Sequence, residues 1–488
     1  MNRPLRRVAF AVLILFGALL LRANWVQVVR GDAYANDSRN SRVLLRTYEQ
    51  ERGPISVLNG TEQTPIARSE DTGGRLRYLR QYAQGPQYAH VTGFVSLVYG
   101  TPQGVERAEN DLLTGNDDRL FVGRLSDYVT GREPSGGSVL LSINPAAQAA
   151  AVEGLAGKRG AAVALDPRTG AVLAMVSAPS FDPSRLSSHT PADIRAYYDE
   201  LTNDPGRPLV NRAISSTYPP GSTFKVVTAA AALGAGGVGV DTPIPSPREL
   251  DLPQTGANLR NFGGSSCSGE TSTLPEALRI SCNTAFGSLG LTLPENALRE
   301  QALAFGFGED DLTAPTRVAA SQYPEETNPP QAAQSAIGQF DVRATPLQMA
   351  MVAAGIANDG EVMRPYLVAE SQAPDLTRLS RQSPDALSRA TSPETAEQIT
   401  AMMELVVADG SGTAAQIDGV RVAGKTGTAQ HAQGRPPHAW FIGFAPAEDP
   451  TVAVAVVVED GGSLGSEATG GRLAAPVARD MMRAVLGR

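Results

Sequence analysis

The sequence predicts an α+β fold, in which one antiparallel sheet flanked by helices follows a single apolar helix and a small, mostly β module. An unbroken apolar run covers residues 8–21. Residues 160–177 have a hairpin pattern, with two apolar runs around the turn sequence Asp-Pro-Arg-Thr-Gly. Three further strand patterns lie near the C-terminus, at Val420–Ala429, Ala439–Phe444 and Thr451–Glu459. Because a mostly helical stretch separates them from the hairpin, the sheet is expected to assemble from distant segments.

The composition is that of a globular protein. Of the 488 residues, 42% are hydrophobic and 19% are charged, which suits two or three folded domains and not a disordered chain. The net charge of −8, with no basic stripe, argues against a nucleic-acid partner. With only two cysteines and four scattered histidines, a zinc site with Cys and His ligands is not expected.

The N-terminus predicts a membrane anchor. Arg3, Arg6 and Arg7 precede the apolar run, and weaker apolar character continues to Val29. The run is shorter than the roughly 20 residues that a spanning helix needs, so a cleaved signal peptide is the alternative. No small-residue cleavage site follows it, and Arg22 can extend toward the far membrane surface. An uncleaved signal anchor is therefore favoured.

The arginines before the run also set the orientation. Because cytoplasmic flanks carry the excess of basic residues, residues 1–7 are expected to form a cytoplasmic tail and residues 8–29 a transmembrane signal anchor. Everything after Arg30 then lies outside the membrane, where disulfides form. Cys267 and Cys282 lie 15 residues apart, and a disulfide between them is favoured over two unpaired, buried cysteines. Closing so short a loop would stabilise the fold by about 3 kcal/mol.

Residues 30–137 are predicted to form a separate, non-catalytic module. This stretch is polar and rich in arginine, and its short candidate strands include Arg42–Leu45 and Val91–Val98. It contains no constellation of catalytic residue types, so a scaffold or oligomerisation role is expected. The domain that carries the sheet then covers residues 138–488 and begins with a strand pattern at Ser138–Ile143.

Lysine is rare in this chain. Of 42 basic residues only three are lysines, Lys158, Lys225 and Lys425, and a buried lysine can lose its proton and act as a base where arginine cannot. Lys225 follows Ser222 by three residues, at the predicted start of a buried helix. That spacing places a hydroxyl nucleophile and an amine on one helix face, near a helix N-terminus that favours negative charge. The alternative is an N-cap serine with a snorkelling lysine, whose amine extends to the surface. Lys158 is expected to lie on the surface.

Lys425 belongs to a predicted strand. The sequence Lys425-Thr426-Gly427-Thr428 continues the strand pattern that begins at Val420. A glycine inside a strand marks a place where another backbone or a ligand approaches closely. The Lys425 amine and the two threonine hydroxyls are therefore predicted to bind a substrate carboxylate. The alternative is an edge strand with incidental polar residues.

Ser281 and Asn283 form a third candidate pair, separated by Cys282. Residues two apart do not share a helix face, so a joint role requires a turn after the predicted helix Leu274–Ile280. Taken alone, the pattern favours the alternative in which Asn283 caps the next helix, Thr284–Leu289.

Two other motif matches are rejected on their context. Residues 419–426 fit the nucleotide-binding pattern G-x-x-x-x-G-K-[ST], but a phosphate loop must open a helix and this stretch is strand-like. Residues 461–465 fit the G-x-S-x-G elbow of α/β-hydrolases, which requires a later histidine, whereas the last histidine, His438, lies upstream. Neither an ATPase nor an α/β-hydrolase is expected.

Together, S-x-x-K, S-x-N and K-T-G in this order resemble the active-site motifs of penicillin-binding proteins and serine β-lactamases. Longer stretches are similar to class B penicillin-binding proteins, most closely the actinobacterial A type: AAVALDPRTGAVLAMVSAPSFDP (161–183), NRAISSTYPPGSTFKVVTAAAAL (211–233), AIGQFDVRATPLQMA (336–350) and VAGKTGTAQ (422–430). The resemblance is specific over residues 140–488. It implies the penicillin-binding/serine β-lactamase-like transpeptidase fold for that part of the chain.

The resemblance implies a membrane-anchored serine D,D-transpeptidase that cross-links peptidoglycan stem peptides and is acylated by β-lactams. Ser222 would attack the penultimate D-Ala carbonyl, and Lys225 would take its proton. Ser281 would relay a proton to the leaving amine, and Asn283 would hold Lys225 and the substrate amide. The family's middle motif is most often Ser-Asp-Asn, and Cys282 replaces the aspartate here, which puts in doubt only the local packing.

The third motif would bind the end of the substrate. Lys425, Thr426 and Thr428, with Gly427 between them, would hold the terminal carboxylate. The backbone N–H groups of Ser222 and Thr428 would form the oxyanion hole. No metal and no organic cofactor is implied.

The implied partners are peptidoglycan stem peptides, β-lactam antibiotics, the bacterial cytoplasmic membrane and a second copy of the chain in a homodimer. Because no glycosyltransferase region is apparent, glycan polymerisation is expected to come from a membrane-embedded polymerase. The chain would cross the membrane once, with its catalytic domain outside. The alternatives are a class D-like serine β-lactamase, which typically lacks the asparagine and needs no anchor, and a β-lactam sensor, which usually has several spans. A purely structural relative would have lost Ser222 or Lys225.

Overall fold

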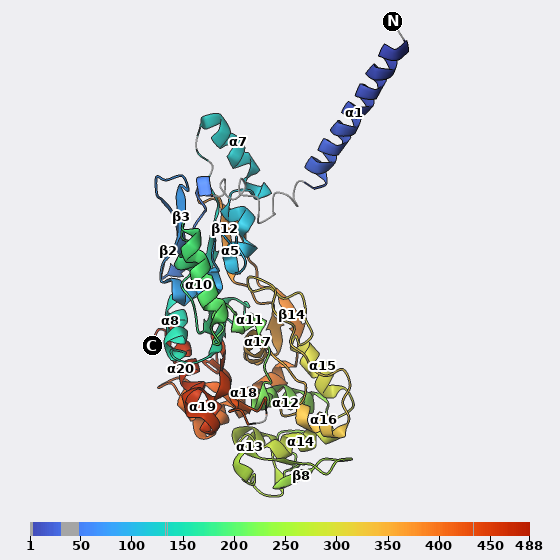
Figure 1. Cartoon of the computed structure of the whole chain (residues 1–488). Coiled ribbons are helices and arrows are strands. Elements are labelled where there is room, and N and C mark those ends of the chain that lie inside the picture. The colour runs from blue at the N-terminus through green and yellow to red at the C-terminus, as the bar shows by residue number, and fades with distance from the viewer. Residues whose placement is uncertain (1–2, 31–47, 132, 134, 433) are drawn as a thin grey trace.

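The computed structural model describes residues 3–30, 48–131, 133, 135–432 and 434–488 of the chain (Figure 1). Its first helix, α1 (Arg3–Val28), is 26 residues long and has no buried residue. No other helix in the described part of the chain is both long and apolar enough to cross a membrane. The helix includes the flanking arginines because arginine is a good helix former. The strand predicted at residues 42–45 lies outside the described residues.

The first sheet connects the N-terminal module with later parts of the chain. Its strand order is β13-β12-β4-β1-β2-β3. The strands are β1 (Ile55–Asn59), β2 (Glu62–Asp71), β3 (Tyr78–Tyr82), β4 (Ser138–Leu141), β12 (Val368–Gln372) and β13 (Arg378–Arg381). β1 and β4 run parallel, and the other neighbouring pairs are antiparallel. The strand predicted from residue 138 is thus present as β4. One of its neighbours, β1, comes from before the predicted boundary at residues 137–138, and the other, β12, comes from after it.

The predicted strand Val91–Val98 is wrong. Val91 and Thr92 end helix α4 (Gly85–Thr92), which has a proline in its first turn, and Gly93 (φ 70°) then turns the chain. A Cβ on Gly93 would collide with the carbonyl of Gln103, so this turn requires glycine. The apolar side chains are buried by helix packing against strand β6 (Val172–Ala178) and not by strand pairing. The module also contains α5 (Gly104–Ala108), α6 (Asn110–Leu113) and α7 (Phe121–Thr130).

The second sheet confirms the antiparallel sheet built from distant segments. Its order is β15-β16-β17-β5-β6, and every neighbouring pair is antiparallel. The strands are β5 (Gly160–Leu165), β6, β15 (Ala423–Ala429), β16 (His438–Ala445) and β17 (Val452–Val458). The valine-rich strand β17 lies in the middle and is buried at every residue, as its lack of polar side chains predicts.

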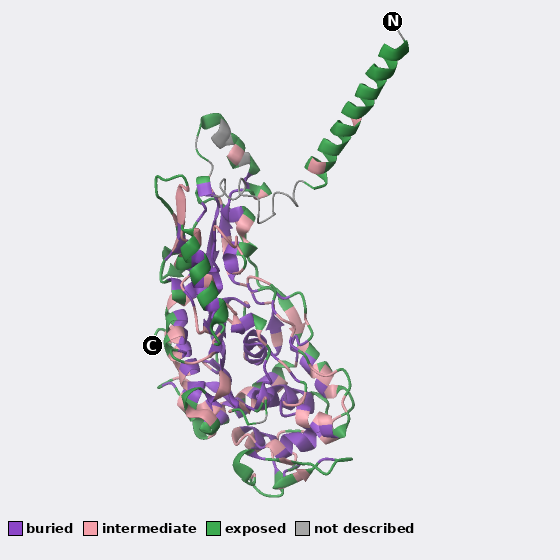
Figure 2. Ribbon diagram, in the orientation of Figure 1, coloured by how far each residue is buried: buried purple, intermediate pink, exposed green. Residues whose placement is uncertain are grey.

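Helices cover both faces of this second sheet. On one face lie α8 (Pro145–Gly154) and α20 (Ala475–Val485), and on the other lies α17 (Pro346–Ala357), which is buried over nearly its whole length. Figure 2 shows the buried residues concentrated on and around the two sheets. The domain therefore has three layers, with the sheet between two layers of helices.

A helical region between β6 and β15 supplies most of the site. Its helices are α9 (Pro183–Leu186), α10 (Pro191–Asn203), α11 (Arg212–Ser215), α12 (Lys225–Gly234), α13 (Leu274–Arg279), α14 (Asn283–Thr292), α15 (Ala297–Ala304), α16 (Pro329–Ser335), α17 and α18 (Pro393–Asp409). Short strands accompany them: β7 (Ile244–Pro245), β8 (Glu249–Asp251), β9 (Asn258–Arg260), β10 (Thr271–Ser272), β11 (Glu361–Met363) and β14 (Ala386–Arg389). Helix α19 (Gly470–Leu473) precedes α20.

Candidate active site

Ser222 stands on a short 3-10 turn, Gly221–Phe224, that leads directly into helix α12. The entry to the turn is held by backbone hydrogen bonds: Tyr218 and Ala344 exchange N–H and C=O groups, and Gly221 N donates to Gly338 O at 2.9 Å. Since side chains three apart eclipse in a 3-10 turn, Lys225 lies on the same side as Ser222. The predicted position of Ser222 near a buried helix start is confirmed.

Lys225 is completely buried, and its amine is held by the middle motif. Its Nζ donates to Ser281 O and to Asn283 Oδ1, each at 2.8 Å, and lies 3.4 Å from Ser281 Oγ. The Phe286 ring lies beside it, with its centroid 5.4 Å from Nζ. Burial, and secondly the charge of Lys425, lower the pKa of Lys225 well below its ordinary value of 10.5. The structure thus excludes the alternative of a surface lysine at this position.

Lys425 reaches the same serine from strand β15. Its Nζ donates to Ser281 Oγ at 2.8 Å and to Thr426 O at 3.0 Å. The side chain is completely buried, and burial lowers its pKa to about 7. Two amines therefore meet at one hydroxyl group, an arrangement in which a proton can pass between the lysines through Ser281. By contrast, Lys158 is half-buried and donates to Gly154 O at the end of α8.

The middle motif occupies the sharp turn between α13 and α14. Ser281 has φ 61°, which is unusual for a residue other than glycine and orients successive residues differently from a helix. Ser281 and Asn283 can consequently face the same lysine although they are two residues apart. Cys282, and not Asn283, occupies the N-cap position of α14, so the alternative role predicted for Asn283 is wrong.

The three motifs meet at a cleft of about 1000 Å³. Its lining includes side chains from each motif: Ser222, Ser281, Asn283, Thr426 and Thr428. The two lysines lie behind this lining. The hydroxyl of Thr426 also contacts Ser411 Oγ at 2.6 Å, at the end of α18.

Strand β15 is the edge strand of its sheet and lies against the Ser222 turn. A Cβ on Gly427 would be 3.1 Å from Pro220 O, and a Cβ on Gly221 would be 3.0 Å from Thr428 O. The close approach predicted from Gly427 is therefore confirmed, and the approaching backbone is that of the nucleophile turn. This contact brings the Ser222 and Thr428 segments together, which is what an oxyanion hole built from their N–H groups requires.

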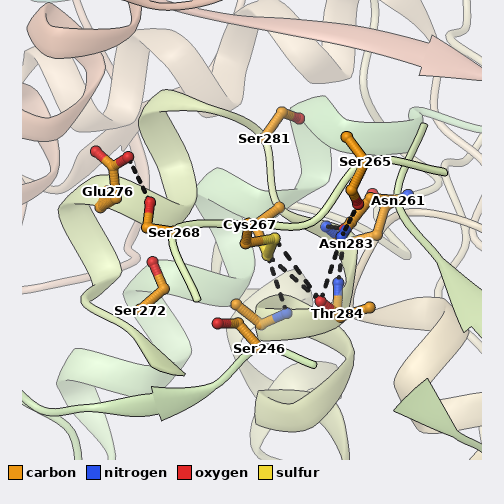
Figure 3. The surroundings of a disulfide bond; sticks show 12 residues. Ser246, Asn261, Ser265, Cys267, Ser268, Ser272, Glu276, Ser281, Asn283 and Thr284 are labelled. Atoms are coloured by element: carbon orange, nitrogen blue, oxygen red, sulfur yellow. Dashed lines mark hydrogen bonds between the residues drawn. A yellow bond between two sulfur atoms is a disulfide. The ribbon is translucent and has the colours of Figure 1, made fainter. Parts of the chain in front are cut away.

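The cysteines are joined in the structure by the predicted disulfide, with a Cα–Cα distance of 5.9 Å (Figure 3). The bridge ties the middle motif to the loop that follows β9. This loop carries Asn261, whose contacts with the middle motif no sequence pattern indicated.

Other site residues were also missed by sequence reasoning. Gly338 (φ 70°) supports Gly221 from α16's C-terminal loop, and a Cβ there would collide with Gly221 O. Ser411 follows α18 and is distant in sequence from every motif. The sequence contains a weak signal for Gly338, a glycine within a stretch that resembles the family, and none for Ser411.

A histidine cluster beside β16 could suggest a metal site. The rings of His431 and His438 stack with centroids 3.9 Å apart and planes 12° apart, and His431 Nε2 lies 2.9 Å from Asp460 Oδ1. Because a metal must lie in the plane of each imidazole that binds it, two parallel stacked rings cannot share one ion. Asp460 is already paired with Arg159 and Arg435. The cluster does not suit a cation.

Family comparisons match both parts of the chain. Residues 160–483 match the family described as "Penicillin binding protein transpeptidase domain". Residues 52–139 match the "Penicillin binding protein A dimerisation domain".

Relatives and solved structures are similar over almost the whole chain. The sequence is 48% identical to the peptidoglycan D,D-transpeptidase PbpA of Mycolicibacterium smegmatis and 45% identical to that of Mycobacterium tuberculosis, over 100% of this chain and 99% of each relative. The structure of the M. tuberculosis penicillin-binding protein A acylated by ceftriaxone has a TM-score of 0.86 at 44% identity, covering 91% of this chain and 100% of that one. Its imipenem acyl-enzyme complex has a TM-score of 0.85 at 45% identity, covering 90% and 100%.

Proposed function

Since this chain belongs to the penicillin-binding protein transpeptidases, the serine D,D-transpeptidases that cross-link peptidoglycan and are acylated by β-lactams, we propose that its acyl-enzyme forms on Ser222. One observation carries this assignment. The amine of the fully buried Lys225 donates hydrogen bonds to Ser281 and Asn283, and both of these residues line the same cleft as Ser222. A nucleophile beside an amine of lowered pKa is the arrangement that acyl transfer needs.

In the first half-reaction, Ser222 Oγ attacks the carbonyl carbon of the penultimate D-Ala of a stem peptide. Neutral Lys225 takes the hydroxyl proton as the C–O bond forms. The N–H groups of Ser222 and Thr428 stabilise the oxyanion, a contribution of about 3 kcal/mol for one such donor. The bond to the last D-Ala then breaks, and Ser281 passes a proton to the leaving amine.

In the second half-reaction, the amine of a neighbouring stem peptide attacks the acyl-enzyme ester. The same groups act in reverse: the incoming amine loses a proton through Ser281 and Lys225, and Ser222 regains one as it leaves. Lys425 has two roles in this scheme. It passes protons at Ser281 and supplies positive charge where Thr426 and Thr428 bind the donor's terminal carboxylate.

We further propose that α1 anchors the enzyme in the cytoplasmic membrane, with Arg3, Arg6 and Arg7 on the cytoplasmic side and the cleft outside. The helix's length and exposed apolar surface support the anchor, and the arginines before its apolar run support the orientation. The matched dimerisation domain supports a homodimer through residues 52–139. Because the chain's matched regions are a dimerisation domain and a transpeptidase, its glycan strands would come from a separate, membrane-embedded polymerase.

Covalent labelling tests the assignment. Fluorescent penicillin should label the wild-type protein stably, with the added mass on the peptide that carries Ser222, and should not label Ser222→Ala. Persistent labelling of Ser222→Ala would refute the assignment. Rapid turnover with release of hydrolysed penicillin would instead indicate a β-lactamase.

A further inference from the structure

The start of helix α14 is capped by a residue from a distant segment. Its own N-cap residue, Cys282, accepts only the third N–H group of the helix, from Ala285 at 3.4 Å, and does so with a sulfur, a weak acceptor that is also bonded to Cys267. The first two N–H groups of the helix, from Asn283 and Thr284, donate instead to Asn261 Oδ1 at 2.7 and 3.2 Å. Asn261 therefore shares with Cys282 the capping role that a single Ser, Thr, Asp or Asn usually fills.

Asn261 is fixed in the orientation that this cap requires. Its side chain is buried, with 8% exposure, and its Nδ2 donates to Ser265 O at 3.0 Å. The residue before it, Arg260, accepts a hydrogen bond on its carbonyl from Asn283 Nδ2 at 2.9 Å. The segment Arg260–Asn261 thus holds both the backbone and the side chain of Asn283.

The disulfide closes the same structure from the other end. It joins Cys267, at the end of the loop that begins at Asn261, to Cys282 in the middle motif. Figure 3 shows Asn261, Ser265 and Asn283 grouped on one side of the bridge, and Thr284 below them, with dashed lines from its hydroxyl to the sulfur atoms. Asn283 is consequently held through the disulfide of its neighbour Cys282 and through the hydrogen bonds that it donates to Arg260 O and Asn261 Oδ1.

We propose that Asn261 is a positioning residue for acyl transfer: it fixes Asn283 so that its Oδ1 meets the amine of Lys225, and the disulfide holds the capping loop in place. This inference rests on the proposed function, because it gives Asn261 no chemistry of its own. Asn283 Oδ1 accepts from Lys225 Nζ at 2.8 Å, and a small rotation of the first turn of α14 would break that bond.

Substitution of Asn261 tests the proposal in the full-length protein. In Asn261→Ala the two helix N–H groups lose their acceptor, and the second-order rate constant for acylation by fluorescent penicillin should fall tenfold or more. Asn261→Asp keeps the acceptor oxygen and should retain at least a third of the wild-type rate constant. Asn203→Ala is the matched control, because Asn203 is an exposed asparagine at the end of α10, outside the cleft lining, whose side chain bonds only to Asp199 O among the described contacts.

The pH dependence of acylation separates positioning from simple stability. Without a placed acceptor the protonated amine of Lys225 is less stabilised, so its pKa falls and the rising limb of the pH–rate profile should move to lower pH in Asn261→Ala. A rate constant within twofold of wild type would overturn the proposal. The proposal would also be overturned if Asn261→Ala were slow and had a lowered thermal midpoint, but its pH–rate profile had not moved. That result would indicate that Asn261 only stabilises the fold. Labelling of Ser222→Ala would refute the proposed nucleophile and not this role of Asn261.

Discussion

Replacing Lys225 with arginine gives the sharpest test of the proton transfer. The Lys225 amine is completely buried and has two oxygen acceptors at 2.8 Å. An arginine there keeps its proton, because at pH 7 only about one in a million guanidinium groups is neutral. General-base catalysis contributes about 10²- to 10⁴-fold, so the acylation rate constant of Lys225→Arg should fall by about three orders of magnitude.

A second cost strengthens this expectation. The two lysines meet at Ser281 Oγ, so a permanent charge at residue 225 would face Lys425 across one oxygen atom. At a separation of about 6 Å and an effective dielectric constant of about 20, two unit charges repel by about 3 kcal/mol. The variant should therefore show a lower thermal midpoint as well as slower acylation. Lys225→Met removes the base without adding charge and should be equally slow.

The assay is fluorescent-penicillin labelling followed in time from pH 5 to pH 10. In the wild type the rate constant should rise with pH as Lys225 loses its proton, and should level off well below pH 10.5, because burial and Lys425 both lower that pKa. Lys425→Met removes one of these causes, so its rising limb should move to higher pH. Lys158→Arg is the matched control and should behave as wild type. Acylation of Lys225→Arg within tenfold of the wild-type rate would refute the reasoning.

Three further predictions concern the surroundings of the nucleophile. Lys425→Arg should lower the acylation rate constant ten- to hundredfold but leave it measurable, because a cation remains near the carboxylate site. Labelling no stronger than that of Ser222→Ala would contradict this. Gly338→Ala should lower the free energy of unfolding by more than about 2 kcal/mol through its left-handed φ and its collision with Gly221 O, whereas Gly157→Ala, with a similar φ and open space, should lose only about 1 kcal/mol. Replacing Cys267 and Cys282 together with alanine should lower it by about 3 kcal/mol in chemical denaturation, and unchanged stability would show that the bridge does not constrain the unfolded chain.

The sequence predicted the strands that are determined by their own residues and by the turns beside them. The hairpin β5–β6 and the strands β15, β16 and β17 appear where runs of alternating or continuous apolar residues lie between turn residues. The strand predicted at Val91–Val98 rested on the same kind of apolar run and was wrong. A short apolar run shows that side chains are buried but not whether a helix or a strand buries them, and here the proline in the first turn of α4 and Gly93 decided for a helix.

The motifs were found in the sequence, but their mutual contacts were not. Spacing placed Lys225 beside Ser222, since three residues make one turn. No spacing rule could show that Lys225 and Lys425, 200 positions apart, share Ser281, or that Asn261 caps the helix of Asn283. Such contacts depend on how β15 packs against the Ser222 turn and how the loop after β9 packs against α14, which is a property of the tertiary fold.

The mixed sheet also limits how this protein can be divided. Strand β4 lies between β1, from the N-terminal module, and β12, which the chain adds about 230 residues later. Cutting the gene just before β4 would leave one side of that strand without its hydrogen-bonding neighbour and expose an apolar edge. Exchange of the N-terminal module between relatives must likewise preserve the fit to β4 and to the β12–β13 hairpin. The N-terminal module and the transpeptidase domain should therefore fold as one unit, although the cleft belongs to only one of them.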